Sequence, residues 1–156
     1  AAFPSGISGV PSEVIESLTP VVIHRRELRQ DSGGAGRYRG GLGQTLEFSV
    51  RTGNPFTFSP LFDRVQFAAQ GADGGQPGAL ARITTSTGEE FDRKGARILP
   101  GGTRVTLDLP GGGGYGDPRE RDPAAVREDV LDGLVSPAAA RSAYGVVSNP
   151  ADREPS

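Results

Sequence analysis

Two glycine-rich stretches carry the residues best suited to hold a negatively charged ligand. The first, RQDSGGAGRYRGGLGQ (residues 29–44), contains six glycines, three arginines and one carboxylate directly before a predicted strand. Glycine lets backbone N–H groups converge where a Cβ would intrude, and arginine adds forked donors that suit phosphate or carboxylate. The candidate anion- or substrate-binding residues of this loop are Asp31, Ser32, Gly33, Gly34, Arg37 and Arg39.

The same loop also fits a purely structural role. It is not a P-loop, because no Lys-Ser/Thr pair follows at the required spacing. It is not a dinucleotide-binding motif either, because its glycines precede a strand rather than open a helix. In the structural alternative, the arginines fold back onto Asp31 or Glu27. The motif taken alone favours that alternative over ligand binding.

The second stretch, PGGGGYGDP (residues 110–118), surrounds one tyrosine with five glycines. Such a path implies either several positive φ angles or very close approach by another chain segment. The candidate site residues of this second loop are Gly111, Gly112, Gly113, Gly114, Tyr115 and Asp117. A structural role is favoured here as well. A third glycine cluster lies in FDRVQFAAQGADGGQPGA (residues 62–79).

Several other kinds of chemistry are not expected. With no cysteine and a single histidine, His24, the chain predicts neither a disulfide framework nor a metal site of its own. No nucleophile elbow accompanies His24, which argues against a catalytic triad. The formal net charge of -2 gives no general attraction to nucleic acid. No apolar run approaches the ~20 residues of a membrane span and no signal peptide is visible, so we expect a cytoplasmic protein without nucleic-acid or membrane partners.

Short apolar and alternating runs recur between turn sequences. The predicted strands are residues 21–28, 44–50, 56–59, 65–69, 81–86, 89–93 and 104–109. Leu46, Phe48 and Val50 alternate with polar residues, which is typical of a strand with one buried face. The chain also has 24 glycines and 13 prolines for turns. These features predict a mainly β fold, a glycine-rich antiparallel sandwich or barrel with a short C-terminal helical pair.

The helical pair is predicted from its capping residues. Asp122 and Gly133 are the expected start and stop signals of the first helix, and Ser136 and Gly145 those of the second. The pair has the rhythm of a helix-turn-helix. However, the second helix offers only Arg141 as a cation, so DNA binding is not expected.

The chain divides into four predicted parts. They are a lead-in segment (1–20), a glycine-rich β domain (21–116), the C-terminal helical pair (117–147) and a disordered tail (148–156). Within the lead-in, PSEVIESL could form a short helix capped by Ser12, but Pro20 and the β-branched run after it favour extended chain. The start, which lacks an initiator Met, suggests the interior of a longer protein.

Taken together, the glycine stretches resemble a known family. The sequences ELRQDSGGAGRYRGGLGQ, then FDR with GADGGQPGA, then KGARILPGGTRVTLDLPGGGGYGDP and the tail that follows occur here in order. They resemble the C-terminal portion of the B subunit in the hydantoinase B/oxoprolinase family, from about Phe3 to Val147. The segment GVPSEVIES departs from the family's usual Thr-Pro-Val-Glu type sequence, which weakens any role for Ser12 or Glu13.

The resemblance implies an activity that this chain would share in, not perform alone. Members of the family hydrolyse cyclic amides such as hydantoins and 5-oxoproline with ATP, and a related branch comprises acetone and acetophenone carboxylases. An A-type subunit or segment carries nucleotide activation, and the B-type partner handles the activated substrate. The metal-associated His and acidic residues are expected in an N-terminal portion that is missing here.

We therefore expect the C-terminal part of the B subunit of an ATP-dependent cyclic-amide hydrolase, inactive by itself, that contributes to an active-site wall and a subunit interface. The fragment is expected to bind no cofactor, while ATP and a divalent metal belong to the complete enzyme. Its expected partners are an A-type subunit, the missing N-terminal part of the B subunit and a small cyclic amide. The alternative is a structural or assembly module of a related ketone carboxylase subunit, without a direct site role.

Overall fold

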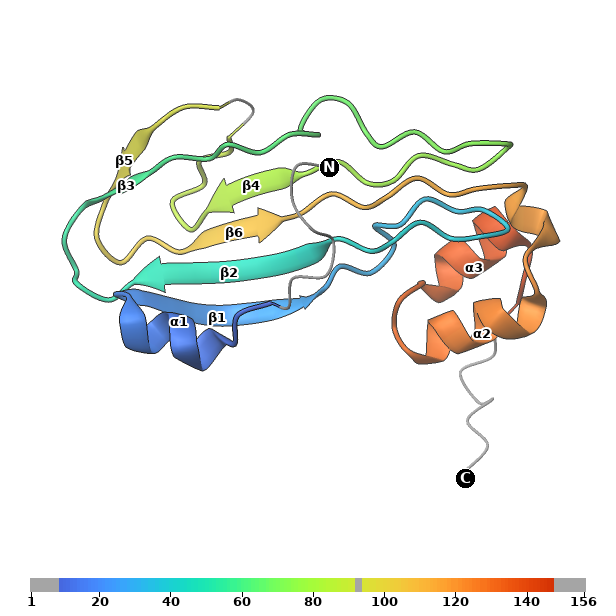
Figure 1. Ribbon diagram of the computed structural model, residues 1–156, viewed down its shortest axis with the longest axis horizontal. Coiled ribbons are helices and arrows are strands. Elements are labelled where there is room, and N and C mark those ends of the chain that lie inside the picture. Colours follow the sequence, from blue (N-terminus) through green and yellow to red (C-terminus); the bar gives the residue numbers. More distant parts are fainter. Residues whose placement is uncertain (1–8, 92–93, 148–156) are drawn as a thin grey trace, which may run out of the picture.

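The computed structural model describes residues 9–91 and 94–147 (Figure 1). In chain order its elements are α1 (Ser12–Leu18), β1 (Val21–Leu28), β2 (Gln44–Val50), β3 (Phe56–Phe58), β4 (Arg82–Thr85), β5 (Arg97–Leu99), β6 (Val105–Asp108), the 3-10 helix η1 (Pro118–Glu120), α2 (Pro123–Leu131) and α3 (Pro137–Tyr144). The strands form two antiparallel sheets, one in the order β1-β2-β6-β4 and one of β3 with β5. The predicted mainly β, antiparallel fold with a helical pair is confirmed, and the described strands do not close into a barrel.

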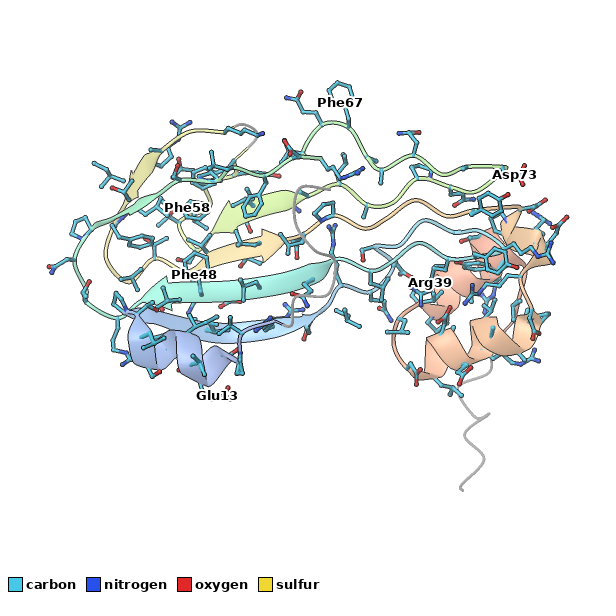
Figure 2. The ribbon with its side chains drawn as sticks, viewed as in Figure 1. Glu13, Arg39, Phe48, Phe58, Phe67 and Asp73 are labelled. Atoms are coloured by element: carbon cyan, nitrogen blue, oxygen red, sulfur yellow. The ribbon has the colours of Figure 1, made fainter. Side chains whose placement is uncertain are left out.

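The two sheets share one apolar core. In the four-stranded sheet, Leu107 of β6 lies between Leu46 of β2 and Ile83 of β4, so apolar residues line up on one face. From the small sheet, Leu99 is 1% exposed and joins the same cluster. The rings of Phe48 and Phe58, which both point into this core in Figure 2, have centroids 6.1 Å apart. The two sheets therefore pack face to face as a small sandwich.

The two C-terminal helices begin and end where their capping residues predict. The Asp122 side chain accepts a hydrogen bond from the first turn of α2, and the Ser136 hydroxyl accepts one from Ala139 N in α3. Gly145 ends α3 in the left-handed conformation, with a φ of 72°. The helices pack together around Val126 and Ala140, which are both fully buried.

Three extended segments join the sandwich to the helices, and all three are rich in glycine. Residues 31–43, 70–79 and 110–117 run side by side toward α3 in Figure 1, and we call them the glycine bundle. Gly34 N–H donates to Gly112 O at 2.8 Å, Gln76 N–H to Ala35 O at 2.7 Å, and Gly114 N–H to Gln76 O at 2.9 Å. Each segment is thus bonded to the other two through its backbone.

Three local predictions are wrong. Residues 12–18 form helix α1 rather than extended chain, because Pro20 lies beyond the helix end and Glu16 uses its carboxylate to cap Ile23 N–H on β1. Residues 65–69 are a loop, since Arg64 has a φ of 63° and Phe67 remains 81% exposed without a partner strand.

The third wrong prediction concerns residues 89–93. Only its residues 89–91 are described, and they bond to the backbone of β4 without forming a named strand. The small sheet instead uses β5, which was not predicted. The predicted tail, residues 148–156, and residues 1–8 of the predicted lead-in lie outside the described residues.

Candidate functional site

The glycine bundle brings together both candidate loops and the third glycine cluster. Most of its glycines are needed for close approach rather than for a left-handed backbone. A Cβ at Gly34 would overlap the Gln76 carbonyl, one at Gly40 the Gly112 carbonyl, and one at Gly113 the Gln70 carbonyl. Within 110–118, Gly116 alone has a positive φ, at 74°. Of the two alternatives raised by the sequence, close approach by other segments therefore holds for Gly111, Gly113 and Gly114, whereas a Cβ at Gly112 would meet no atom closer than 3.3 Å.

Asp31 and Ser32 begin the first segment of the bundle and tie it to neighbouring parts of the chain. Asp31 has a φ of 59° and forms two hydrogen bonds with the α2–α3 connection. Its N–H donates to Leu134 O at 3.1 Å, and its carboxylate accepts from Ser136 N at 2.8 Å. The hydroxyl of Ser32, which is 1% exposed, donates to Arg29 O at 2.6 Å and accepts from Gly43 N at 2.9 Å. Both side chains are thus engaged in bonds within the chain.

Arg39 lies in an ion cluster with partners far along the sequence. It binds the Asp129 carboxylate with two nitrogens, each at 3.0 Å, and Arg121 binds the same carboxylate at 2.9 Å. All three side chains are at most 16% exposed. The cluster fastens α2 to the bundle, so Arg39 is ion-paired as in the structural alternative, but to Asp129 rather than to Asp31 or Glu27.

Burial beside this cluster also affects the phenol of Tyr144. Removal from water raises the pKa of Tyr144, and the positive charges of Arg121 and Arg39 partly oppose that rise. The phenol therefore stays neutral across the physiological pH range.

Arg37 lies at the exposed end of the bundle. Its guanidinium is 5.8 Å from the centroid of the Tyr38 ring and 3.8 Å from a carboxylate oxygen of Glu120. The Tyr38 and Tyr115 rings are 6.3 Å apart, and each backbone N–H donates to the other residue's carbonyl at 2.9 Å. Asp117 caps η1 by accepting from Arg119 N at 2.9 Å. Of the two candidate arginines, Arg37 is the one whose side chain is largely exposed, at 56%.

A pocket of about 220 Å³ lies between the bundle and α3. Candidate residues Asp31, Gly33 and Gly34 line one side, and Ser142 and Tyr144 lie on the other. Neither Arg37 nor Arg39 lines it. The first candidate loop is therefore split among a pocket wall, a buried ion cluster and an exposed tip.

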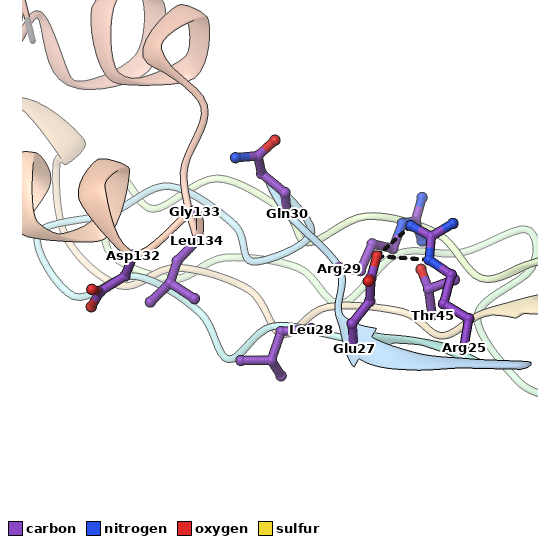
Figure 3. Close-up of a pocket in the computed structure, with 9 residues that line it drawn as sticks. All are labelled: Arg25, Glu27, Leu28, Arg29, Gln30, Thr45, Asp132, Gly133 and Leu134. Atoms are coloured by element: carbon purple, nitrogen blue, oxygen red, sulfur yellow. Dashed lines mark hydrogen bonds and ion pairs between the residues drawn. The ribbon is translucent and has the colours of Figure 1, made fainter. Parts of the chain in front are cut away.

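A larger pocket, of about 560 Å³, was not predicted from the sequence (Figure 3). It lies between the end of β1 and the α2–α3 connection, and is lined by Arg25, Glu27, Leu28, Arg29, Gln30, Thr45, Asp132, Gly133 and Leu134. In Figure 3 the Arg25–Glu27 ion pair lies at one end, and Leu28 and Leu134 lie toward the other. Its two walls are about one hundred residues apart in the chain, so no local sequence signal marks it.

Across residues 9–91 and 94–147, no group of three or more His, Cys, Asp or Glu is placed to hold a metal ion. None of the helices in those ranges combines the length and the apolar character that a bilayer crossing requires.

Comparison with known proteins identifies the family. The family model described as hydantoinase B/oxoprolinase matches residues 1–118. The chain belongs to the hydantoinase B/oxoprolinase family. It is 38% identical over 143 residues to the caprolactamase subunit beta of Pseudomonas jessenii, and the match covers 86% of this chain and 24% of that protein. It is also 34% identical over 126 residues to the 5-oxoprolinase PfmaA of Pestalotiopsis fici, over 75% of this chain and 10% of that protein.

Solved structures agree with this assignment. The ATP-dependent caprolactamase from Pseudomonas jessenii superposes with a TM-score of 0.76 at 34% identity, covering 90% of this chain and 25% of that one. A nucleotide-free acetone carboxylase superposes with a TM-score of 0.71 at 25% identity, covering 94% of this chain and 24% of that one. The chain thus spans about a quarter of the caprolactamase subunit and of either solved chain.

Proposed function

We propose that this chain is the C-terminal part of the B-type subunit of a cytoplasmic, ATP-dependent cyclic-amide hydrolase. In this proposal the chain contributes to an active-site wall and to the contact with an A-type subunit or segment. The observation that carries it is the match to this family along most of the chain, with relatives that include an ATP-dependent caprolactamase and a 5-oxoprolinase. We assign ATP and divalent-metal binding to other parts of the complete enzyme.

The hydrolysis of a ring amide defines what an active-site wall must provide. Ring amides are unreactive, and phosphorylation of the amide oxygen would create both a leaving group and a negative charge. A wall beside that group needs donors that are already fixed in place. The glycine bundle supports this role, because its segments are held by backbone hydrogen bonds and leave little room for rearrangement.

Arg37 is the donor that we propose for the anionic group. Among the described residues its one ion-pair partner is Glu120, at 3.8 Å and largely exposed, whereas Arg39 is buried and bound through two nitrogens to Asp129. Weakly paired charge at the rigid tip suits a phosphate or carboxylate that arrives from another part of the enzyme. Arg39 is proposed to act indirectly, by fixing the bundle against α2.

Substitution in the complete subunit with its partner tests the role of Arg37. Arg37→Gln is expected to raise the KM for the cyclic amide about 10-fold, the usual cost of losing a charged hydrogen bond. The matched control is Arg119→Gln, which removes an exposed arginine of η1 that bonds to Asp117 through its backbone N–H rather than its side chain. Unchanged KM and kcat for Arg37→Gln would contradict a substrate role and favour the purely structural alternative.

A mixing experiment separates the two functions more broadly. A B-type subunit truncated before this segment is combined with the 156-residue chain. Restored hydrolysis supports a contribution to the site. Restored assembly without hydrolysis supports the alternative, an assembly module such as one in a ketone carboxylase subunit, which the structural likeness to acetone carboxylase also accommodates. Hydrolysis by the 156-residue chain alone would overturn the division of labour proposed here.

A further inference from the structure

The four-stranded sheet has two edge strands, β1 and β4, and their outward-facing backbone groups differ in how they are hydrogen-bonded. At β4, groups outside the sheet bond to the outward-facing backbone. Thr85 N–H donates to Glu89 O at 2.9 Å, and Ile83 O accepts from Phe91 N at 3.0 Å. An edge strand without such cover presents free N–H and C=O groups that can pair with another chain. The β4 edge is therefore closed.

The first half of β1 is covered as well. Ile23 N–H donates to the Glu16 carboxylate of α1 at 2.7 Å, and Val21 N–H donates to the Thr19 hydroxyl at 3.3 Å. The pairing with β2 then shifts between Ile23 and Arg25, which places a bulge at His24. Beyond the bulge, α1 no longer supplies partners.

The second half of β1 has outward backbone groups without described partners. Arg29 N–H donates to Gly43 O at 2.9 Å, which shows which residues of this stretch point their backbone groups toward β2. Residues 25, 27 and 29 face β2, so the N–H and C=O groups of Arg26 and Leu28 point away from it. Among residues 9–91 and 94–147, no recorded hydrogen bond from outside β2 reaches the backbone of Arg26 or Leu28.

The pocket of about 560 Å³ lies against this open stretch. Leu28 is 53% exposed on one wall, and Leu134 lines the other. When a strand is added to a sheet edge, main-chain hydrogen bonds supply affinity, and pockets for alternate side chains supply specificity. An unpaired edge and an adjoining partly apolar pocket are the two elements of such a binding site.

We propose that an extended segment of the same, longer polypeptide adds to the β1 edge at Arg26–Leu28 and places an apolar side chain between Leu28 and Leu134. This rests on the part of the proposed function that makes the chain one portion of a longer B-type subunit. The caprolactamase subunit and its solved chain are about four times as long as this chain, which supplies the segment. The chain N-terminal to α1 lies beside this edge, because the Arg26 guanidinium donates to Val10 O at 2.6 Å.

A competing interpretation is that the edge is simply shielded. A bulge and charged side chains are devices that keep edge strands from associating, and His24 and the Arg25–Glu27 ion pair lie here. Shielding predicts that the backbone of Arg26 and Leu28 stays exposed to solvent in the complete subunit. Strand addition predicts that it becomes protected. The two differ in a quantity that can be measured at single amides.

The test is amide hydrogen exchange in the complete subunit. The amides of Arg26 and Leu28 are expected to exchange roughly 100-fold more slowly there than in the 156-residue chain alone. The amides of Thr85 and Phe91, bonded within this chain, serve as controls and are expected to be protected in both. If they lose protection in the 156-residue chain, the comparison moves to variants of the complete subunit.

Those variants are Leu28→Pro and Leu28→Val. Proline removes an N–H that β2 does not use, which an edge strand tolerates, so the β1–β2 ladder is kept while the added strand loses a bond. In the complete subunit, Leu28→Pro is expected to abolish the exchange protection of the Arg26 amide without affecting that of the Thr85 amide. Leu28→Val is expected to retain the protection of the Arg26 amide.

Three outcomes would overturn the proposal. Equally fast exchange at Arg26 and Leu28 in the 156-residue chain and in the complete subunit would show that no strand is added and that the edge stays exposed to solvent. Protection that appears only when the partner subunit is added would assign the edge to another protein. Protection that rises with the concentration of the 156-residue chain would indicate a second copy. A subunit with protected amides but no cyclic-amide hydrolysis would instead contradict the proposed function and leave this inference intact.

Discussion

The sandwich and the glycine bundle are ordered by opposite means. The sandwich excludes water with side chains, among them Leu99, Val105 and the Phe48–Phe58 pair. The bundle has almost no side chains between its segments, and its carbonyls lie where a Cβ would be. Removal of side-chain atoms therefore damages the sandwich, whereas addition of a single methyl group damages the glycine bundle.

The largest effect is expected from adding that methyl group to the bundle. Gly34→Ala would force a Cβ into the Gln76 carbonyl and the Gly114 backbone, which cannot move without breaking bonds to the third segment. We expect a loss of more than about 4 kcal/mol in the free energy of unfolding, enough to unfold the bundle. Urea denaturation followed by tyrosine fluorescence measures it.

Gly41→Ala is the matched control within the same loop. Nothing lies within 4 Å of a Cβ at Gly41, and its φ is not in the left-handed range. We expect a change of less than about 1 kcal/mol. If both alanine variants behaved alike, backbone packing would not be what holds the bundle together.

In the sandwich, removal of buried atoms is the damaging change. Leu99→Ala is expected to cost about 3 kcal/mol, because Leu99 is 1% exposed and the space that it leaves cannot be refilled by backbone. Its neighbour on β5, Ile98, is 77% exposed, so Ile98→Ala should cost less than about 0.5 kcal/mol in the same urea titration. Equal losses would mean that β5 does not close the core as described.

The attachment of the helices to the bundle depends on charge. Asp129→Asn would leave Arg39 and Arg121 facing each other without their shared carboxylate. We expect a cost of about 2 kcal/mol, below that of a fully buried pair because the side chains retain some exposure. Glu120→Gln, at the exposed Arg37 pair, should cost less than about 0.5 kcal/mol. Similar thermal melting temperatures for the two variants would contradict a special role for Asp129.

Apart from the control variants, the smallest effect is expected at a helix cap. Ser136→Ala removes the hydroxyl that accepts from Ala139 N and should cost about 1 kcal/mol. Ser136→Asp keeps an acceptor at the same place and should restore most of the loss. A persistent loss in the aspartate variant would show that Ser136 acts through something other than the cap.

The parts of the fold that local chemistry determines could be predicted from the sequence. The caps of α2 and α3, the alternation in β2 and β6 and the order of the glycine motifs each depend on residues close in the chain. The sequence favoured extended chain over helix α1, because one contact that supports the helix is between separate elements: the Glu16 carboxylate accepts a hydrogen bond from Ile23 N–H on β1. The run at 65–69 looked like a strand but found no partner to bury Phe67.

The candidate site was harder to predict for the same reason. The close approach of the glycines in residues 110–118 was one of the two alternatives that the sequence raised. The partner of Arg39 lies 90 residues away in the sequence, and the larger pocket joins β1 to the α2–α3 connection. Whether Arg37 binds an anion remains a prediction. Contacts between distant segments leave no local spacing pattern, so only the folded chain brings them together.

The backbone-held bundle has a consequence for how this protein looks in spectroscopy. Its residues are neither helical nor assigned to a named strand, yet their amides are bonded to other segments. Far-ultraviolet circular dichroism would count them as coil and make the chain look largely unstructured. Measurements that report on amide protection would instead place these same residues among the best-ordered parts of the molecule.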